Sequence, residues 1–471
     1  MRYLSTRGEA PPLGFDDVLL TGLAPDGGLY LPESWPQLSA GTLAGFAGKP
    51  YAEVAAEVMR PFLQGSCALD ALDDLSARAY ARFARSGTCP LVQIDECTWL
   101  LELFHGPTLA FKDVAMQLLG DLFEHVLAAR DERITIVGAT SGDTGSAAIE
   151  ACRDRERIDI VILHPRGRTS EVQRRQMTTV DAANVHNVAV EGTFDDCQAL
   201  VKSMFADRGF REDVGLAAVN SINFARILAQ TVYYVTAAVA LGAPQRRIAF
   251  SVPTGNFGNV FAGYAAGRMG LPIERLLVGS NSNDILTRFF ETGEMASKDV
   301  VLTLSPSMDI QVSSNFERLL YDMLDGDGAA VAETMDGFKR TGRFALSDAQ
   351  LQRARAGFDG VRLDDAGTLQ EIARQERATG MLVDPHSAVG LAAARAKPAP
   401  DGVPTVALAT AHPAKFPDAV ERATGRRPDL PDRLSDLYDR PERYTTLPNR
   451  LAEVQAHVRA ASRRARAPAA G

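Results

Sequence analysis

The 471-residue chain contains no run of about 18 apolar residues, the length that a helix needs to cross a bilayer. Its opening, Met1 to Ser5, lacks the charged and then apolar layout of a secretory signal. The five cysteines form no C-x-x-C pair, which argues against a disulfide framework or a zinc ribbon. The seven histidines show no metal-ligand spacing, so we expect no metal site. We expect a reduced, cytoplasmic protein that contacts no membrane.

Basic residues are fewer than acidic residues in this chain. The chain has 59 acidic and 50 basic residues, a net charge of -9, which argues against a general nucleic-acid-binding surface. Only the end, Ser462 to Gly471, is rich in arginine, and we expect it to be a solvated terminus. No G-x-S-x-G motif occurs, which disfavours a serine hydrolase.

From Arg133 onward, short β-rich runs alternate with segments of helical length. Strands are expected at residues 134–137, 158–163, 185–190, 248–252, 276–278 and 405–409. Because parallel strands need crossover helices, this alternation predicts an α/β protein. The expected divisions are an N-terminal, mostly helical unit (1–98), a smaller lobe carrying Lys112 (99–240), a larger lobe (241–445) with a helical insertion at 299–380, and a C-terminal helix with a basic tail (446–471).

One segment combines an isolated lysine with glycine, hydroxyl and apolar neighbours: Phe104-His105-Gly106-Pro107-Thr108-Leu109-Ala110-Phe111-Lys112-Asp113. An apolar pattern of helical spacing follows, so we expect Thr108 as the N-cap and Lys112 in the first turns of a helix. The positive end of the helix dipole and the apolar Phe111 both favour an uncharged amine, which a Schiff-base lysine requires. Taken alone, the segment also fits a surface lysine on a helix.

Two further segments place glycine-rich turns between a strand and a helix. The first, Gly138 to Ser146, is neither G-x-G-x-x-G nor Walker A, so it suits a carboxylate or a small phosphate rather than a dinucleotide. An ordinary tight turn fits it equally well. The second is Ser251 to Asn259. Two such turns in one α/β chain favour an anionic ligand.

A fourth segment, Ala409 to Phe416, follows the last expected strand directly. Ligands of open α/β sheets bind beyond the carboxyl ends of the strands. We therefore expect this segment to lie near the ligand.

Together these segments resemble threonine synthases, which are pyridoxal-phosphate enzymes of the tryptophan-synthase-β fold type. The resemblance extends, in the order of the longer microbial and fungal branch, to Met1–Arg7, Gly27-Gly28-Leu29-Tyr30, Asn220-Ser221-Ile222-Asn223, Asp384-Pro385-His386 and Thr410–Phe416. It implies two lobes, each with a mainly parallel sheet flanked by helices (fold type II), plus the N-terminal unit. It also implies pyridoxal 5'-phosphate as cofactor, and conversion of O-phospho-L-homoserine and water to L-threonine and phosphate.

The resemblance assigns roles residue by residue. Lys112 resembles the catalytic lysine that holds the cofactor as a Schiff base, and Thr410 resembles the hydroxyl residue that faces the pyridine nitrogen. The loop expected to bind the cofactor phosphate comprises Gly255, Asn256, Phe257 and Gly258. The loop expected to grip the substrate comprises Thr140, Ser141, Gly142, Asp143 and Thr144. Many relatives have Asn where this chain has Asp143, which leaves open which group contacts the ring hydroxyl of the cofactor.

For the substrate phosphate we expect Asn223 and Arg226, which lie one turn apart at the start of a helix. Arginine suits phosphate because its planar fork donates two parallel hydrogen bonds. A salt bridge on the helix surface is the alternative for Arg226, and Lys415 is a weaker candidate for the same anion.

Two other functions fit part of this pattern. A dehydratase or phospholyase of the same fold, releasing 2-oxobutyrate, would share Lys112 and the glycine loop. A non-catalytic relative that binds pyridoxal phosphate would be expected to lack the lysine or the loop, and both are present. The Asn223 and Arg226 pair favours a phosphorylated substrate. The expected partner is this small molecule alone, with the chain acting as a monomer or homodimer.

Overall fold

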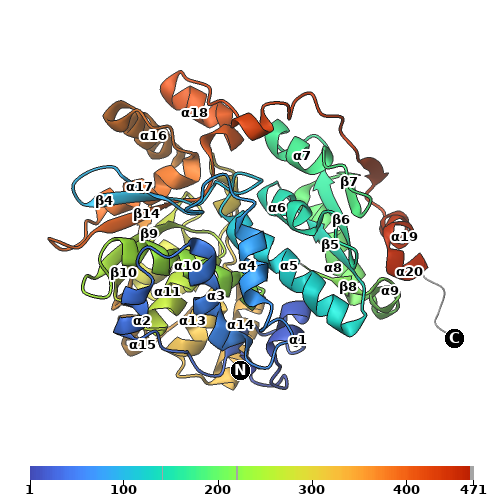
Figure 1. Cartoon of the computed structure of the whole chain (residues 1–471), viewed down its shortest axis with the longest axis horizontal. Coiled ribbons are helices and arrows are strands. Elements are labelled where there is room, and N and C mark those ends of the chain that lie inside the picture. Colours follow the sequence, from blue (N-terminus) through green and yellow to red (C-terminus); the bar gives the residue numbers. More distant parts are fainter. Residues whose placement is uncertain (141, 219–220, 467–471) are drawn as a thin grey trace. The chain divides into compact units, whose positions relative to one another are not determined.

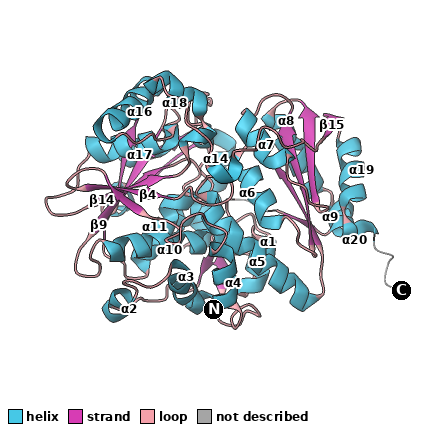
Figure 2. Ribbon diagram, turned by 45° about the horizontal axis from the view of Figure 1, so that its top comes forward, coloured by secondary structure: helices cyan, strands magenta, loops and turns pink. Residues whose placement is uncertain are grey.

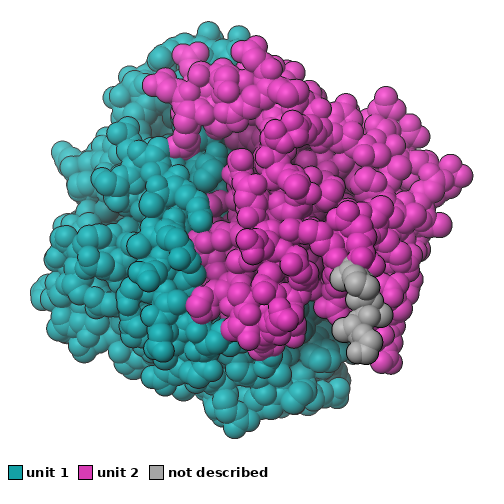
Figure 3. All heavy atoms as spheres, turned by 45° about the vertical axis from the view of Figure 1, so that its right-hand side comes forward, with its two compact units in different colours: residues 1–115, 221–428 teal, residues 116–220, 429–471 magenta. Residues whose placement is uncertain are grey.

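The computed structural model describes residues 1–140, 142–218 and 221–466. Contacts divide the chain into two compact units, which Figure 3 shows in two colours. Unit 1 comprises residues 1–115 and 221–428, and unit 2 comprises residues 116–220 and 429–471. These boundaries differ from those expected from the sequence. Lys112 belongs to unit 1, and so do the first 98 residues, because helix α3 (Tyr51–Met59) packs against helix α10 (Phe224–Ala240) of the same unit.

Unit 1 is built on a six-stranded sheet in the order β13-β10-β9-β14-β4-β3. Its strands are β3 (Leu91–Gln93), β4 (Thr98–Glu102), β9 (Ile248–Pro253), β10 (Ile273–Ser280), β13 (Phe358–Arg362) and β14 (Thr405–Ala409). All neighbouring strands are parallel except β3 and β4. Ala407 of β14 pairs with Ser251 of β9 on one side and Leu100 of β4 on the other. The carboxyl ends of these three strands therefore meet at one edge of the sheet.

Helices cover both faces of this sheet (Figures 1 and 2). The helices of unit 1 are α1 (Phe15–Thr21), α2 (Ala40–Gly45), α3, α4 (Leu72–Tyr80), α10, α11 (Gly258–Arg268), α12 (Ile285–Thr292), α13 (Phe316–Met323), α14 (Gly328–Thr341), α15 (Asp348–Arg355), α16 (Asp365–Thr379), α17 (Pro385–Ala396) and α18 (Pro417–Thr424). Figure 2 shows α16, α17 and α18 on one side of the sheet and α10 and α11 on the other. Apolar side chains of α16, α17 and α18 form one core cluster with Leu100 and Ala407.

The segment 299–380 is not a purely helical insertion. Strand β13 lies within it and pairs with β10 at the sheet edge. Two small antiparallel pairs complete the strands of unit 1: β1 (Tyr3–Ser5) with β2 (Tyr30–Pro32), and β11 (Glu294–Ala296) with β12 (Arg343–Ala345). These elements are not predicted from the sequence, because strands of three to five residues carry little periodic signal.

Unit 2 contains a five-stranded parallel sheet in the order β15-β7-β6-β5-β8. Its strands are β5 (Ile134–Ala139), β6 (Ile158–Pro165), β7 (Val185–Glu191), β8 (Leu216–Ala217) and β15 (Thr445–Pro448). Its helices are α5 (Lys112–Arg130), which begins in unit 1, α6 (Asp143–Cys152), α7 (Glu171–Thr178), α8 (Phe194–Ala206), α9 (Arg208–Val214), α19 (Leu451–Ala461) and α20 (Arg463–Arg466). Every residue of β6 is buried, as in a strand covered on both faces.

Helix α19 and Arg463 belong to this fold. Val454 and Val458 of α19 join the core cluster that contains Val161 and Val188. Arg463, expected in a solvated tail, binds Asp159 with its Nε 2.7 Å from a carboxylate oxygen. The expectation of a solvated terminus is therefore wrong for Ser462, which is buried, and for Arg463, because a buried carboxylate on β6 needs a cation. Residues 464–466 are exposed, as expected.

Candidate active site

The proposed cofactor residues of unit 1 follow three adjacent strands. The segment leading to Lys112 follows β4, Thr410 follows β14, and the loop 255–258 follows β9. Backbone pairing continues beyond the sheet edge: the N–H of Phe111 donates to the carbonyl oxygen of Thr410 at 2.8 Å, and the N–H of His412 donates to that of Leu109 at 3.0 Å. The main chain thereby places the Lys112 segment beside Thr410.

Thr108 is not the N-cap of a helix, contrary to the sequence prediction. Leu109 has a φ of +63° and the next residue pairs with Ala411, so helix α5 begins only at Lys112. The Thr108 hydroxyl instead donates to Asp113 Oδ1 at 2.7 Å, while the Thr108 N–H donates to Asp113 Oδ2 at 2.8 Å. Asp113 therefore fixes the loop that precedes the lysine.

Lys415 also fixes this loop. Its side chain is fully buried, and its Nζ donates to the carbonyl oxygen of Thr108 at 2.7 Å. This contact gives Lys415 a structural role next to Asp113 and Lys112. We therefore do not retain it as a candidate for the substrate phosphate.

Lys112 is the first residue of α5 and is 8% exposed. Its Nζ lies 5.0 Å from the centroid of the Phe111 ring. Both the aromatic wall and the positive end of the helix dipole were expected from the sequence, and the structure has both. A surface lysine directed into solvent is excluded by this burial.

The loop 255–258 ends at the N-terminus of helix α11. Phe257 has a φ of +62° and occupies the N-cap position, where its side chain makes no capping hydrogen bond. The first N–H groups of an α-helix lack partners within the helix. This end of α11 can therefore bind a phosphate through its backbone.

Residues 307–315 pack against the loop 255–258 and bind its backbone. The hydroxyl of Ser313 donates to the carbonyl oxygen of Gly255 at 2.8 Å, and both the N–H and the side-chain amide of Asn315 donate to that of Asn256, at 3.1 and 3.0 Å. A Cβ atom on Gly255 would lie 3.0 Å from the carbonyl oxygen of Ser307. Sequence reasoning missed Ser313 and Asn315, because no local motif marks them.

The expected substrate loop lies in unit 2, between β5 and α6. The Thr140 hydroxyl accepts hydrogen bonds from the N–H groups of Gly142 at 3.0 Å and Gly145 at 2.9 Å, so it shapes the loop internally. Asp143 is buried, and its carboxylate accepts a 2.9 Å hydrogen bond from Gln173 Nε2. Thr144 is half-buried, and Ser141 lies outside the described residues.

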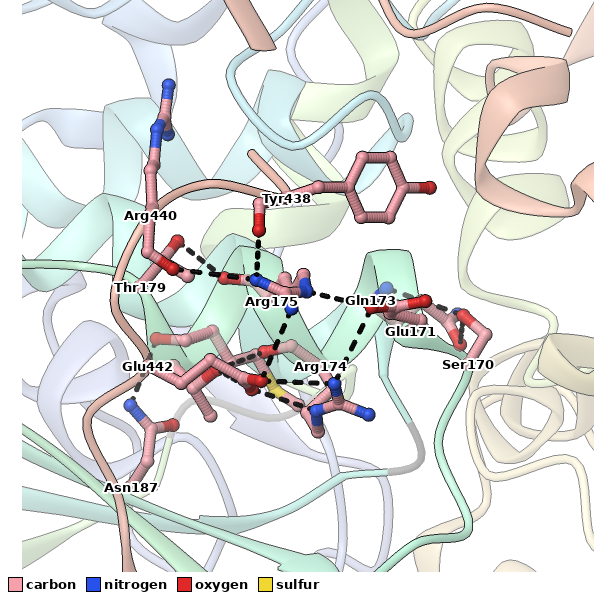
Figure 4. Close-up of polar contacts among 12 residues, drawn as sticks. Ser170, Glu171, Gln173, Arg174, Arg175, Thr179, Asn187, Tyr438, Arg440 and Glu442 are labelled. Atoms are coloured by element: carbon pink, nitrogen blue, oxygen red, sulfur yellow. Dashed lines mark hydrogen bonds and ion pairs between the residues drawn. The ribbon is translucent and has the colours of Figure 1, made fainter. Parts of the chain in front are cut away.

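Helix α7, which carries Gln173, is anchored to the segment 438–442, as Figure 4 shows. Glu442 accepts from Arg174 Nε at 2.8 Å and from the Thr178 hydroxyl at 2.7 Å, and these bonds lower the pKa of its carboxyl. Arg175 donates to the carbonyl oxygen of Tyr438 at 2.8 Å. The partner of Asp143 thus sits on a helix fixed by charge-assisted hydrogen bonds.

Asn223 and Arg226 occupy the first turn of α10, as predicted. Asn223 is the N-cap: its Oδ1 accepts from the N–H of Ala225 at 3.0 Å, and its Nδ2 donates to the carbonyl oxygen of Leu19 at 2.8 Å. Arg226 is only 3% exposed, which rules out the salt bridge on the helix surface. Its Nε and Nη1 have no hydrogen-bond partner among the described residues. Burial lowers its pKa to about 10, so the guanidinium remains charged at neutral pH.

Family comparisons account for this arrangement. Residues 2–80 match the family model of the threonine synthase N terminus, and residues 387–458 match the model of the threonine synthase C-terminal region. Residues 87–410 match the model of pyridoxal-phosphate dependent enzymes. The threonine synthase of Pseudomonas aeruginosa is 56% identical over 460 residues, covering 97% of this chain and 98% of that relative. The chain belongs to the threonine synthase family.

Solved structures of threonine synthases agree. The crystal structure of PLP-bound threonine synthase from Brucella melitensis has a TM-score of 0.97 at 54% identity, covering 98% of this chain and 100% of that one. Threonine synthase from yeast has a TM-score of 0.92 at 38% identity, covering 98% of each chain. The expected fold class, the family and the dependence on pyridoxal phosphate are confirmed.

The described residues of unit 1 suit this cofactor. Lys112 offers a buried amine, the N-terminus of α11 offers an anion site, and Thr410 offers a hydroxyl. The three groups follow three neighbouring strands of the sheet.

Among the described residues, no cluster of three or more metal-ligating side chains occurs. No described helix combines the length and apolar character that a membrane span requires.

Proposed function

We propose that this chain converts O-phospho-L-homoserine and water to L-threonine and phosphate. The observation that carries the choice of substrate is Arg226, a buried guanidinium with two unused donors in the unit that also holds Lys112. A buried charge without a partner is costly, so an anionic ligand is the natural complement of this side chain. The N-terminus of α11 supports a second, separate phosphate.

The reaction places specific demands on the side chains. A proton must leave Cα of the substrate and a second must leave Cβ before phosphate departs from Cγ, after which water adds at Cβ. Bound pyridoxal phosphate supplies an electron sink for the loss of these protons. The protein must therefore hold the phosphate of the substrate and move protons at two adjacent carbons.

Lys112 is proposed to move these protons. Its amine would hold the cofactor covalently. When not bound to the cofactor, this amine, 5.0 Å from the centroid of the Phe111 ring and fixed at the start of α5, would accept and return protons at Cα and Cβ. Its burial excludes water that would compete for them.

Thr410 is proposed to face the ring nitrogen of the cofactor. A hydroxyl can donate or accept a hydrogen bond there, but unlike a carboxylate it does not enforce a protonated nitrogen. The loop Gly255, Asn256, Phe257 and Gly258 is proposed to bind the cofactor phosphate through backbone N–H groups.

The substrate contacts remain proposals of the same kind. Thr140, Ser141, Gly142, Asp143 and Thr144 are proposed to bind the amino acid part of the substrate, with Arg226 binding its phosphate. Asn223 would add one amide N–H, because its side-chain oxygen and another N–H already serve the cap and Leu19. We further propose that the protein is cytoplasmic and acts as a monomer or homodimer. Light scattering on the purified protein would test the oligomeric state.

One incubation tests the proposed reaction. Purified protein loaded with cofactor is given O-phospho-L-homoserine, and phosphate, threonine and 2-oxobutyrate are measured together. Threonine in a one-to-one ratio with phosphate is expected. If 2-oxobutyrate were the main product, the chain would instead be a lyase of the same fold.

A further inference from the structure

Asp384 is a buried carboxylate that no step of the proposed reaction uses. It precedes α17 and accepts backbone hydrogen bonds from the N–H groups of His386 and Ser387, both at 3.0 Å, which cap that helix. It also accepts two side-chain bonds, from His386 Nδ1 at 2.6 Å and from the Ser387 hydroxyl. A helix cap needs only the backbone bonds, so the two side-chain bonds call for another explanation.

One of these side chains leads to Thr410. The backbone N–H of Thr410 donates to the Ser387 hydroxyl oxygen at 3.1 Å. Because the Ser387 hydroxyl gives its own proton to Asp384, its oxygen is left as the acceptor for Thr410. Asp384 thereby determines which way this hydroxyl points and holds the backbone at the end of β14.

The other side chain leads to the phosphate loop. Since His386 Nδ1 donates to the carboxylate, the neutral imidazole presents Nε2 as an acceptor, and the N–H of Ser307 donates to it at 3.2 Å. The carbonyl oxygen of Ser307 lies against Gly255, where a Cβ atom would be 3.0 Å away. The imidazole is also held by the Phe416 ring, with centroids 4.7 Å apart.

We infer that Asp384 is a positioning residue of the cofactor site, acting on both of its ends. Through Ser387 it sets the backbone of Thr410, and through His386 it sets the segment at Ser307 against the loop at Gly255. All members of this network are buried or half-buried and have partners, the condition under which a polar network rigidifies a site. The inference rests on the proposed roles of Gly255 and Thr410.

A matched pair of substitutions isolates the His386 branch. In His386→Gln, the amide oxygen can occupy the place of Nε2 and accept from Ser307, whereas in His386→Asn the amide nitrogen can occupy the place of Nδ1 and donate only to Asp384. Both variants lose the ring contact with Phe416 equally. His386→Gln keeps the hydrogen bond to Ser307 and loses the one to Asp384, and His386→Asn does the reverse. The comparison therefore shows which of the two bonds acts on the phosphate loop.

The readout is the affinity of each apoprotein for pyridoxal phosphate and for pyridoxal, which lacks the phosphate. His386→Asn should weaken binding of pyridoxal phosphate about tenfold relative to His386→Gln, with pyridoxal affinity the same in both. Equal affinities of the two variants for pyridoxal phosphate would overturn the inference. So would an equal loss for both ligands, which indicates general destabilisation.

The Ser387 branch has its own pair. Ser387→Ala removes the acceptor for the Thr410 N–H, and Ser387→Thr restores a hydroxyl. A shifted absorption maximum of the bound cofactor in Ser387→Ala, returning to the wild-type value in Ser387→Thr, is the expected result. Identical spectra in both variants would overturn the role at the ring end.

Gly258→Val, measured in the same assays, separates this inference from the proposed cofactor loop. If Gly258→Val leaves phosphate-dependent affinity unchanged, the loop itself is misassigned. If Gly258→Val loses that affinity while His386→Asn keeps it, only the role of Asp384 is rejected.

Discussion

The backbone N–H of Phe111 donates a 2.8 Å hydrogen bond to the carbonyl oxygen of Thr410. Lys112 follows Phe111 directly, so the main chain sets the register between the lysine and the hydroxyl residue. Side chains at positions 112 and 410 do not make this contact. Substitution of either side chain therefore leaves the two groups of this backbone hydrogen bond in place.

Lys112→Ala should give a folded protein that cannot bind the cofactor covalently. Borohydride reduction followed by peptide mapping locates the adduct on Lys112 in the wild type and finds none in the variant. The exposed Lys202, changed to Ala, serves as the control and should keep the adduct. An adduct on a different lysine in the wild-type protein would refute the assignment.

Gly255→Val and Gly258→Val should weaken binding of pyridoxal phosphate, because a side chain blocks close approach of the backbone to the phosphate. The structure adds a cost in stability, since a Cβ atom would lie 3.0 Å from Ser307 at position 255 and 3.2 Å from the Asn315 amide at position 258. Gly337, whose Cβ would meet no atom within 4 Å, is the control site. The affinity for pyridoxal, which lacks the phosphate, is measured alongside to correct for the change in stability. If each variant lost affinity for pyridoxal and for pyridoxal phosphate equally, the phosphate would bind elsewhere.

Arg226→Lys should keep the bound cofactor but lose turnover of O-phospho-L-homoserine. Lysine retains the charge without the fork, so a bidentate contact loses roughly 1–3 kcal/mol, on the order of ten- to a hundredfold in kcat/KM. Steady-state kinetics and cofactor occupancy are measured together. An unchanged kcat/KM would remove Arg226 from the substrate site, and loss of cofactor would assign it to the other phosphate.

Asn223→Ala should act mainly on stability. The substitution removes the N-cap of α10 and the hydrogen bond to Leu19, and loss of such a cap costs about 0.5–2 kcal/mol. Asn223→Asp keeps the acceptor of the cap and is the matched variant. In urea unfolding, the free energy of unfolding should decrease in the order wild type, Asn223→Asp, Asn223→Ala. An Ala variant as stable as the wild type would contradict the capping role.

Unit 2 should lose stability in mild acid. Burial lowers the pKa values of His164, His186 and His457, all in this unit, below the ordinary value of 6.5. Between the ordinary and the lowered pKa, the unfolded chain binds more protons than the folded one, so the free energy of unfolding falls as the pH falls. Below the lowered pKa, this contribution no longer changes.

His164→Gln tests this pH dependence, because it removes one of the three groups. Unfolding in urea at a series of pH values should show a shallower loss of stability for the variant than for the wild type. His125→Gln, on the unit 2 part of α5, is the control. An identical slope for His164→Gln and the wild type would show that His164 does not contribute.

The candidate site was predictable where its residues follow a strong local signal. Gly255 comes two residues after β9 and Thr410 directly after β14, and a strand followed by glycine or hydroxyl residues is visible in the sequence. Ser313, Asn315 and Ser387 were not predictable in this way. They act through hydrogen bonds to backbone groups far along the chain, and single serines or asparagines carry no signal of such a partner.

The sequence by itself determined that the chain is an α/β protein and which segments carry its chemistry, because runs of apolar residues and glycine turns are local properties. Only the tertiary structure decided that Lys112 belongs to the same unit as Thr410 and the loop at Gly255. It also decided that α5 begins at Lys112 and that Arg226 is buried. These outcomes depend on which distant strands become neighbours and on what packs over them. Such choices are made by the free energy of the whole fold rather than by any one segment.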